Sequence, residues 1–170
     1  MRRGRRGFIR ARTLRVSAIL LSLTALSLSA EELRGRVVGI TDGDTLTLLD
    51  PQKAQHKVRL NGIDAPESSQ AFGQVSKRNL SELVFGQDVV VVWTKLDRYG
   101  RIVGTVLKGT IDANLEQLRA GLAWYFRRYE SDVPAPNRVL YDAAEADAKA
   151  TKRGLWRDPS PTAPWVFRGP

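Results

Sequence analysis

Two aspartates flank a short predicted hairpin and could share one cation. Asp44 precedes an apolar run over residues 46–49, and Asp64 follows a second run over residues 58–60, with Asp50-Pro51 as the turn between them. Such a hairpin brings Asp44 and Asp64 together, and two neighbouring carboxylates repel unless a cation lies between them. The chain has no cysteine and one histidine. This composition excludes thiolate and multi-histidine metal sites and leaves an all-oxygen site for a hard divalent ion.

Three separated motifs carry a specific resemblance. They are Asp42-Gly43-Asp44-Thr45, the run that ends in Ile63-Asp64-Ala65-Pro66-Glu67, and Asp97-Arg98-Tyr99-Gly100-Arg101. In this order they resemble the motifs of the staphylococcal nuclease (thermonuclease) family, over roughly residues 33–156. The resemblance implies an OB-type barrel. It also implies a nuclease that cleaves DNA and RNA with little sequence preference and leaves 3′-phosphates and 5′-hydroxyls.

The resemblance also implies catalytic roles for three charged residues. Arg59 and Arg101 match the two catalytic arginines of the family, and Glu67 matches its general base. An arginine suits phosphate because its planar fork binds two oxygens and stays protonated. Fixed donors at a developing anion are worth about 10²–10³ in rate each, and a positioned base about 10²–10⁴. Arg98 and Tyr99 stand where the family has a lysine and a tyrosine that hold the terminal phosphate.

The expected cofactor is calcium. Asp44 and Asp64 match the family's side-chain ligands, and Ala65 matches the residue that gives a main-chain carbonyl. The family usually has threonine at that position, and a carbonyl ligand survives the change to alanine. Asp42 matches a nearby acid that acts through water. The segment over residues 68–73 is shorter than the corresponding loop of the staphylococcal enzyme, which affects expected substrate access and leaves endo against exo cleavage open.

Other interpretations of these residues remain open at this point. Alone, Asp42-Gly43-Asp44 is an ordinary turn, and the motif over residues 97–101 is a hairpin tip with solvated charges. A non-catalytic OB-type nucleic-acid-binding module is the rival hypothesis, and a different phosphodiesterase on the same site is a third. A pure binding module would not need all five of the residues assigned to catalysis and metal binding, which are Asp44, Arg59, Asp64, Glu67 and Arg101.

The first 30 residues are predicted to be a signal peptide. They hold seven arginines and no acid, followed by an apolar run and small residues that offer a cleavage site. Arg5-Arg6-Gly7-Phe8-Ile9-Arg10 resembles a twin-arginine signal, with an ordinary secretion signal as the alternative. The whole chain has a net charge of +9. Without the seven arginines, 20 Lys and Arg remain against 18 Asp and Glu, a net charge of +2, so total charge does not indicate nucleic-acid binding.

The remaining chain is expected to form one nuclease domain over residues 31–157, followed by a Pro-rich, extended tail over residues 158–170. The predicted fold class is α+β, mostly β, with a five-stranded OB-type barrel and about three helices. Strands are predicted over residues 33–40, 46–49, 58–60, 88–94 and 102–107, and helices over residues 74–85, 115–120 and 138–152. We expect an exported monomer, periplasmic or secreted, with DNA and RNA as substrates and no stable membrane association after processing.

Several further side chains have simpler expected roles. Asn114 is predicted to cap the second helix, and Pro134-Ala135-Pro136 to form a loop. Glu145 and Lys149 are interpreted as an exposed i, i+4 pair, and His56 as solvated. One basic, aromatic stretch could either stack bases or pack in the core; it comprises Tyr125, Phe126, Arg127, Arg128 and Tyr129.

Overall fold

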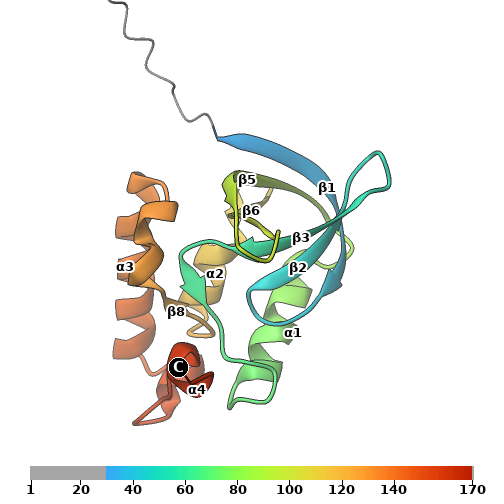
Figure 1. The fold of residues 1–170 in the computed structure, drawn as a ribbon. Coiled ribbons are helices and arrows are strands. Elements are labelled where there is room, and N and C mark those ends of the chain that lie inside the picture. Colours follow the sequence, from blue (N-terminus) through green and yellow to red (C-terminus); the bar gives the residue numbers. More distant parts are fainter. Residues whose placement is uncertain (1–29, 170) are drawn as a thin grey trace, which may run out of the picture.

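Five strands close into a barrel in this computed structural model, which describes residues 30–169 (Figure 1). The sheet runs in the order β3-β2-β1-β5-β6-β7, with β7 (Ile111–Asp112) as a short edge strand, and β3 also pairs in parallel with β6, which closes the barrel. This architecture confirms the predicted α+β fold with an OB-type barrel. The barrel strands are β1 (Glu31–Ile40), β2 (Thr45–Leu49), β3 (Gln55–Leu60), β5 (Asp88–Leu96) and β6 (Ile102–Lys108).

The alternation of apolar residues along the strands fills the barrel interior. Because successive strand residues point to opposite faces, every second residue of a half-buried strand reaches the core. The pairs Leu46 and Leu48 on β2, and Val58 and Leu60 on β3, are all fully buried. The register of β1 against β2 shifts after Val37, a bulge of the kind that bends a strand and lets a small sheet close.

Three helices accompany the barrel. They are α1 (Gly73–Val84), α2 (Ala113–Arg119) and α3 (Ala135–Ala150), and α2 contacts both of the others. Both α1 and α2 contact strands of the barrel, and α3 packs against α2 and β8 (Trp124–Tyr125). Their existence was predicted from the sequence, with ends displaced by one to three residues. The remaining short elements are β4 (Ile63–Asp64), β7 (Ile111–Asp112), β8 (Trp124–Tyr125), η1 (Arg127–Asp132), η2 (Gly154–Arg157) and α4 (Pro164–Phe167).

Two helix starts differ from the sequence-based expectation. The cap of α2 is Asp112, whose carboxylate accepts a hydrogen bond from the Leu115 amide at 3.1 Å. Asn114 is instead fully buried, where its amide group donates to the Asn61 side-chain oxygen at 2.8 Å and links the helix to the barrel. The segment predicted as a loop at residues 134–136 begins α3, because Pro136 stands in the first turn, where no amide hydrogen is needed.

Two polar side chains that were expected to face solvent are more buried and better partnered than predicted. Glu145 is buried, accepts a hydrogen bond from the Tyr125 amide at 2.9 Å, and pairs with Lys149 at 2.9 Å. It therefore ties β8 to α3 rather than forming a surface pair. His56 is half-buried, and its Nε2 lies 2.8 Å from the carboxylate of Asp50 across the β2–β3 turn.

The C-terminal segment is not the extended tail that its proline content suggested. It contains the short helix α4, which lies near β8 below the barrel (Figure 1). Trp165 on α4 stacks on Phe126, with ring centroids 5.0 Å apart and planes 8° apart. The segment therefore returns to the body of the domain after residue 158.

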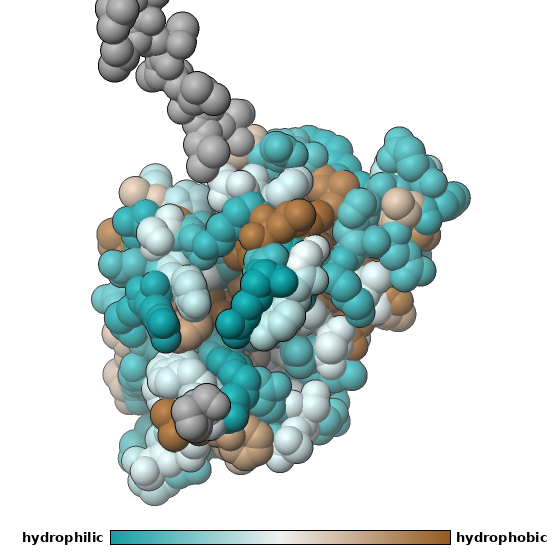
Figure 2. All heavy atoms as spheres, viewed as in Figure 1, coloured by the Kyte–Doolittle hydropathy of each residue, from teal (hydrophilic) through white to brown (hydrophobic). Residues whose placement is uncertain are grey.

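The surface in the view of Figure 2 is mostly hydrophilic, and its hydrophobic side chains form separate patches. One of these patches lies beside the C-terminal end of the chain, at the bottom of the view. Within residues 30–169, no helix has the length and apolar character needed to span a membrane. The predicted signal segment falls almost entirely on residues 1–29, which lie outside the described part of the chain.

Candidate active site

Two buried carboxylates form the centre of the site. Asp44 stands immediately before β2 and is 4% exposed, and Asp64 ends the short strand β4 and is 0% exposed. The Ala65 amide donates to Asp44 Oδ2 at 2.6 Å, and the Leu60 amide donates to the Asp44 carbonyl at 2.8 Å. These bonds place the two acidic segments side by side, as the predicted hairpin required.

The turn before Asp44 is shaped by close packing at Gly43. A Cβ atom at this position would lie 1.8 Å from Ser76 Oγ, so only glycine fits there. The Gly43 carbonyl accepts a hydrogen bond from Gln117 at 2.5 Å, which joins the turn to α2. Asp42 accepts a hydrogen bond from the Asp44 amide at 3.1 Å and stabilises the same turn. The Asp-Gly-Asp motif is therefore fixed from both sides.

Arg59 connects the two carboxylates. It lies on β3 opposite Thr45, so its side chain enters the site from the strand next to Asp44. Its Nη2 donates to Asp64 Oδ1 at 2.8 Å, and its Nη1 forms an ion pair with Asp44 Oδ2. Burial alone would lower the pKa of Arg59, but the carboxylates of Asp44 and Asp64 outweigh it and raise that pKa.

Burial disfavours the ionised forms of Asp44 and Asp64, and Arg59 compensates for only part of this effect. Burial raises the pKa of Asp44 to about 6, although Arg59 acts in the opposite direction. Burial also raises the pKa of Asp64, against the opposing effects of Arg168 and Arg59. A buried carboxylate stays ionised only where cations compensate it. The ionised forms of Asp44 and Asp64 would therefore be stabilised by a further cation beside them.

Glu67 lies at the open edge of this acidic centre. Its side chain is 34% exposed, so water can reach the carboxylate. The loop that follows is tightly folded, because the Gln70 amide donates to the Glu67 carbonyl at 2.8 Å and the Gln70 side chain accepts from the Glu67 amide at 3.2 Å. Gly73 passes so close to the Glu67 carbonyl that a Cβ atom there would lie 1.8 Å from it. The backbone of Glu67 is held by the loop, and its carboxylate is partly exposed.

The second basic motif forms the turn between β5 and β6. Asp97 organises it, accepting hydrogen bonds from the Arg101 side chain at 2.7 Å and from the Tyr99 amide at 2.9 Å. Tyr99 is largely exposed, and the guanidinium groups of Arg98 and Arg101 lie 5.0 and 5.5 Å from its ring centroid. Arg101 immediately precedes Ile102 on β6, the strand that pairs with β3, which carries Arg59. This turn thus adds a cationic, aromatic rim to the end of the barrel.

A metal ion at this site would depend on few protein ligands. Within residues 30–169, no group of three or more His, Cys, Asp or Glu side chains could hold a metal ion. The donors that do come together are the carboxylates of Asp44 and Asp64, beside the main chain of Ala65. These are hard oxygen donors, which suit calcium, and waters commonly complete such a shell. The Arg168 guanidinium already lies on Asp64 as a stand-in cation, which shows that the pair fits positive charge.

Comparison with known sequences agrees with this geometry. A family model described as "Staphylococcal nuclease homologue" matches residues 57–158. A protein of Haemophilus influenzae described as an uncharacterized endonuclease is 41% identical over 158 residues, which cover 92% of this chain and 85% of that protein. The chain belongs to the staphylococcal nuclease family. A Shigella flexneri protein described as micrococcal nuclease is 37% identical, over 81% of each chain. A further relative, from Escherichia coli and also described as an uncharacterized endonuclease, is 41% identical over 81% of this chain.

The staphylococcal nuclease motifs thus fall into two groups in this structure. Direct contacts join Asp44, Ala65, Arg59 and Asp64, with Glu67 linked to Asp64 through Arg168. The motif residues Arg98, Tyr99 and Arg101 lie on the separate β5–β6 turn, where their described contacts are with one another and with Asp97.

Arg168 is the residue that the family motifs did not indicate. Its Nη2 donates to Asp64 Oδ2 at 2.7 Å, and its Nη1 donates to Glu67 Oε1 at 2.7 Å. The residue lies 104 positions after Asp64, in a segment without periodicity or a recognisable motif. The only signal in the sequence is that Arg168 is the single charged residue after Asp158.

The aromatic side chains of the stretch over residues 125–129 are mostly engaged in packing. Tyr125 is buried and meets Tyr141 edge to face, with centroids 6.0 Å apart. Phe126 is stacked against Trp165 and lies edge to face with Tyr129 at 5.0 Å. Of the two expectations for this stretch, core and rim packing therefore accounts for Tyr125 and Phe126.

Proposed function

We propose that this nuclease depends on calcium, hydrolyses both DNA and RNA, and leaves 3′-phosphate and 5′-hydroxyl ends. The observation that carries this proposal is Arg59, which is held between the buried carboxylates of Asp44 and Asp64, with the partly exposed Glu67 at the edge of the same site. Family membership supports nuclease activity, and the residue set supplies the base, the cationic donors and the oxygen ligands that this chemistry requires.

In the proposed reaction, Glu67 takes a proton from a water molecule, and the water oxygen attacks phosphorus. The bond from phosphorus to the 5′-oxygen breaks, and the leaving oxygen takes up a proton to become a hydroxyl. Arg59 and Arg101 bind the phosphate oxygens, whose negative charge grows as the new bond forms. Calcium held by Asp44, Asp64 and the Ala65 carbonyl would supply additional positive charge against the phosphate.

The remaining motif residues bind substrate or support the ligands in this proposal. Arg98 and Tyr99 lie exposed on the β5–β6 turn, where they can hold a terminal phosphate. Arg98 in place of the family's lysine keeps the charge but not the geometry of the donors. Asp42, which already fixes the Asp44 amide, acts on the ion through water.

The ion requirement is tested by digesting plasmid DNA and RNA in calcium, magnesium or excess chelator. We expect cleavage of both nucleic acids with calcium and its loss on chelation, with recovery when calcium is added back. Full activity in excess chelator would remove the metal role of Asp44 and Asp64. Binding of both nucleic acids without cleavage under any ion would favour the non-catalytic binding module.

We further propose that the protein is exported as a monomer, either to the periplasm or out of the cell. The arginine-rich start and the apolar run of residues 1–30 support this, although they lie outside the fold described above. N-terminal sequencing of protein isolated from cells should give a start between residues 28 and 31. A soluble intracellular form that keeps Met1 and Arg2 would contradict export. Unchanged export after replacing Arg5 and Arg6 with lysine would exclude the twin-arginine route.

A further inference from the structure

The C-terminal segment places a cation directly on the proposed metal ligand. Arg168 donates from Nη2 to Asp64 Oδ2 at 2.7 Å and from Nη1 to Asp64 Oδ1 at 3.2 Å, so both oxygens of this carboxylate are engaged. Nη1 also donates to Glu67 Oε1 at 2.7 Å. The guanidinium of Arg168 therefore binds both the proposed metal ligand, Asp64, and the proposed base, Glu67. The contact raises the pKa of Arg168, since hydrogen bonds to both carboxylates favour its charged form.

The segment that carries Arg168 is defined here as the C-terminal cover, residues 159–169. The chain just before it is firmly anchored, because Leu155 and Trp156 are buried in a cluster with Ala148. Pro159 and Pro161 then break regular structure. The last residues that are anchored in this buried cluster therefore lie just before the start of the cover.

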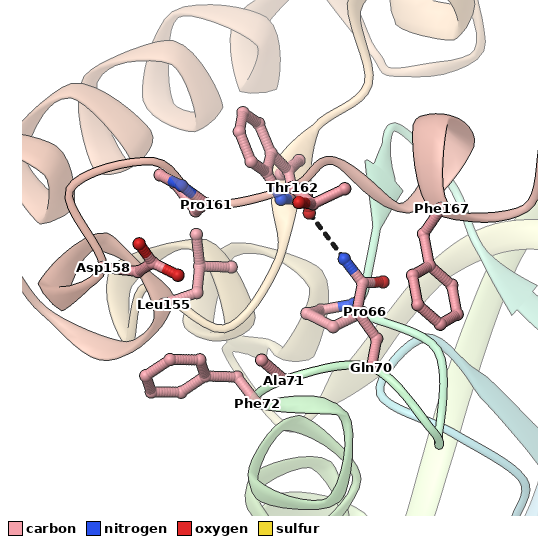
Figure 3. A pocket seen from close by; sticks show the side chains of 10 residues that line it. Pro66, Gln70, Ala71, Phe72, Leu155, Asp158, Pro161, Thr162 and Phe167 are labelled. Atoms are coloured by element: carbon pink, nitrogen blue, oxygen red, sulfur yellow. Dashed lines mark hydrogen bonds between the residues drawn. The ribbon is translucent and has the colours of Figure 1, made fainter.

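Few contacts hold the cover in place. Trp165 stacks on Phe126, and the Gln70 side chain donates to the Thr162 carbonyl at 2.5 Å, the bond drawn in Figure 3. Ala163 and Pro164 are buried, but Val166 and Phe167 remain 63% and 47% exposed, so the cover buries only part of its apolar surface. A segment with few buried apolar contacts opens at a lower free-energy cost than the core of the domain.

A cavity also separates part of the cover from the domain. It has a volume of about 200 Å³ and lies between the loop that follows Glu67 and the cover (Figure 3). Pro66, Ala71 and Phe72 line one side, and Pro161 and Phe167 line the other. Over this cavity the apolar side chains of the cover and of the loop are not tightly packed against each other.

From these contacts we propose that the C-terminal cover is an autoinhibitory element, in which Arg168 competes with the divalent ion for Asp64. A calcium ion binds carboxylate oxygens at about 2.3–2.6 Å. A guanidinium that lies 2.7 and 3.2 Å from the two Asp64 oxygens would compete with such an ion for space and would repel its charge. Ion binding then displaces Arg168, frees Glu67 and opens the site. This inference rests on the proposed metal role of Asp64.

Competition within one chain has a defined effect on ion affinity. When only the open form binds the ion, the apparent dissociation constant rises by the inverse of the open fraction. Removing Arg168 eliminates the competitor, so the ion should bind more tightly. A structural role for Arg168 predicts the opposite, because loss of a supporting contact would weaken or leave unchanged the binding of calcium.

The test is calcium binding by isothermal titration calorimetry on the full-length protein without nucleic acid. Arg168→Ala should lower the dissociation constant by about fivefold to tenfold, the effect expected for a bidentate but partly exposed ion pair. Arg157→Ala is the matched control, because it removes the same charge from an exposed position just before the cover. It should leave calcium affinity unchanged. Equal or weaker binding by Arg168→Ala, or equal tightening by both variants, would overturn the proposal.

Tryptophan fluorescence gives a second readout. Calcium should change the emission of the wild-type protein, because Trp165 leaves Phe126 and Trp124 when the cover opens. The change should be smaller in Arg168→Ala, whose cover is already released, and an identical change in both proteins would contradict the proposal. Failure of the proposed function gives a different pattern, in which neither protein binds calcium or cleaves nucleic acid.

Discussion

Replacing Glu67 with glutamine should lower kcat by about 10²–10⁴ and leave affinity for the substrate nearly unchanged. The amide keeps the size of the side chain and can still meet Arg168 through its oxygen, but it cannot take a proton from water. Because the Glu67 backbone is held by Gln70, the substitution should not displace the loop. The measurement is kcat and KM on one DNA substrate in calcium, together with binding of the same DNA by fluorescence anisotropy.

Glu82→Gln is the matched control for this experiment. Glu82 is exposed on α1, so the same chemical change there should leave kcat at the wild-type value. A near-wild-type kcat in Glu67→Gln would remove this residue as the general base. Circular dichroism of each variant shows that a loss of turnover is not a loss of folding.

The arginines should show the second large effect. Arg101→Lys and Arg59→Lys should each lower kcat by about 10² or more, although the charge is kept. Lysine presents one point charge in place of a planar fork, so it cannot bind two phosphate oxygens in the same geometry. At Arg59 it also cannot bridge Asp44 and Asp64 as the guanidinium does.

Arg119→Lys tests whether this loss is specific to the site. Arg119 lies on the surface of α2, where it pairs only with Glu116 at 2.6 Å among the described contacts. Its substitution should change neither kcat nor KM. If Arg101→Lys behaves like Arg119→Lys, the β5–β6 turn binds or steers substrate without stabilising the transition state. Thermal denaturation of Arg59→Lys is needed as a check, since this residue also compensates two buried carboxylates.

Local patterns in the sequence were sufficient to predict the barrel and the acidic centre. Alternating apolar residues and the Asp50-Pro51 turn fix a hairpin, and a hairpin brings its two ends together whatever surrounds it. Asp44 and Asp64 are therefore neighbours, as expected, and Arg59 contacts both. The helices were found for the same reason, because their periodicity is local.

The features that the sequence did not reveal depend on contacts between distant segments. Arg168 reaches Asp64 in a segment whose Trp165 docks on Phe126, and no local pattern encodes either contact. The sequence around Glu145 does not indicate whether its face of α3 is exposed or buried. In the structure, β8 packs against this face. Asp112 and Asn114 are both residue types that cap helices. Asp112 caps α2, because the side chain of Asn114 is bonded to buried partners in the barrel.

The chemistry of the cleaved ends tests the central claim most directly. A short DNA duplex is digested by the wild-type protein with calcium in oxygen-18-labelled water, and the fragments are analysed by mass spectrometry. If Glu67 activates water against phosphorus and the 5′-oxygen leaves, the label appears in the 3′-phosphates and the 5′ ends are unlabelled hydroxyls. Labelled 5′-phosphates, or DNA that stays intact under conditions in which RNA is cut, would contradict the account.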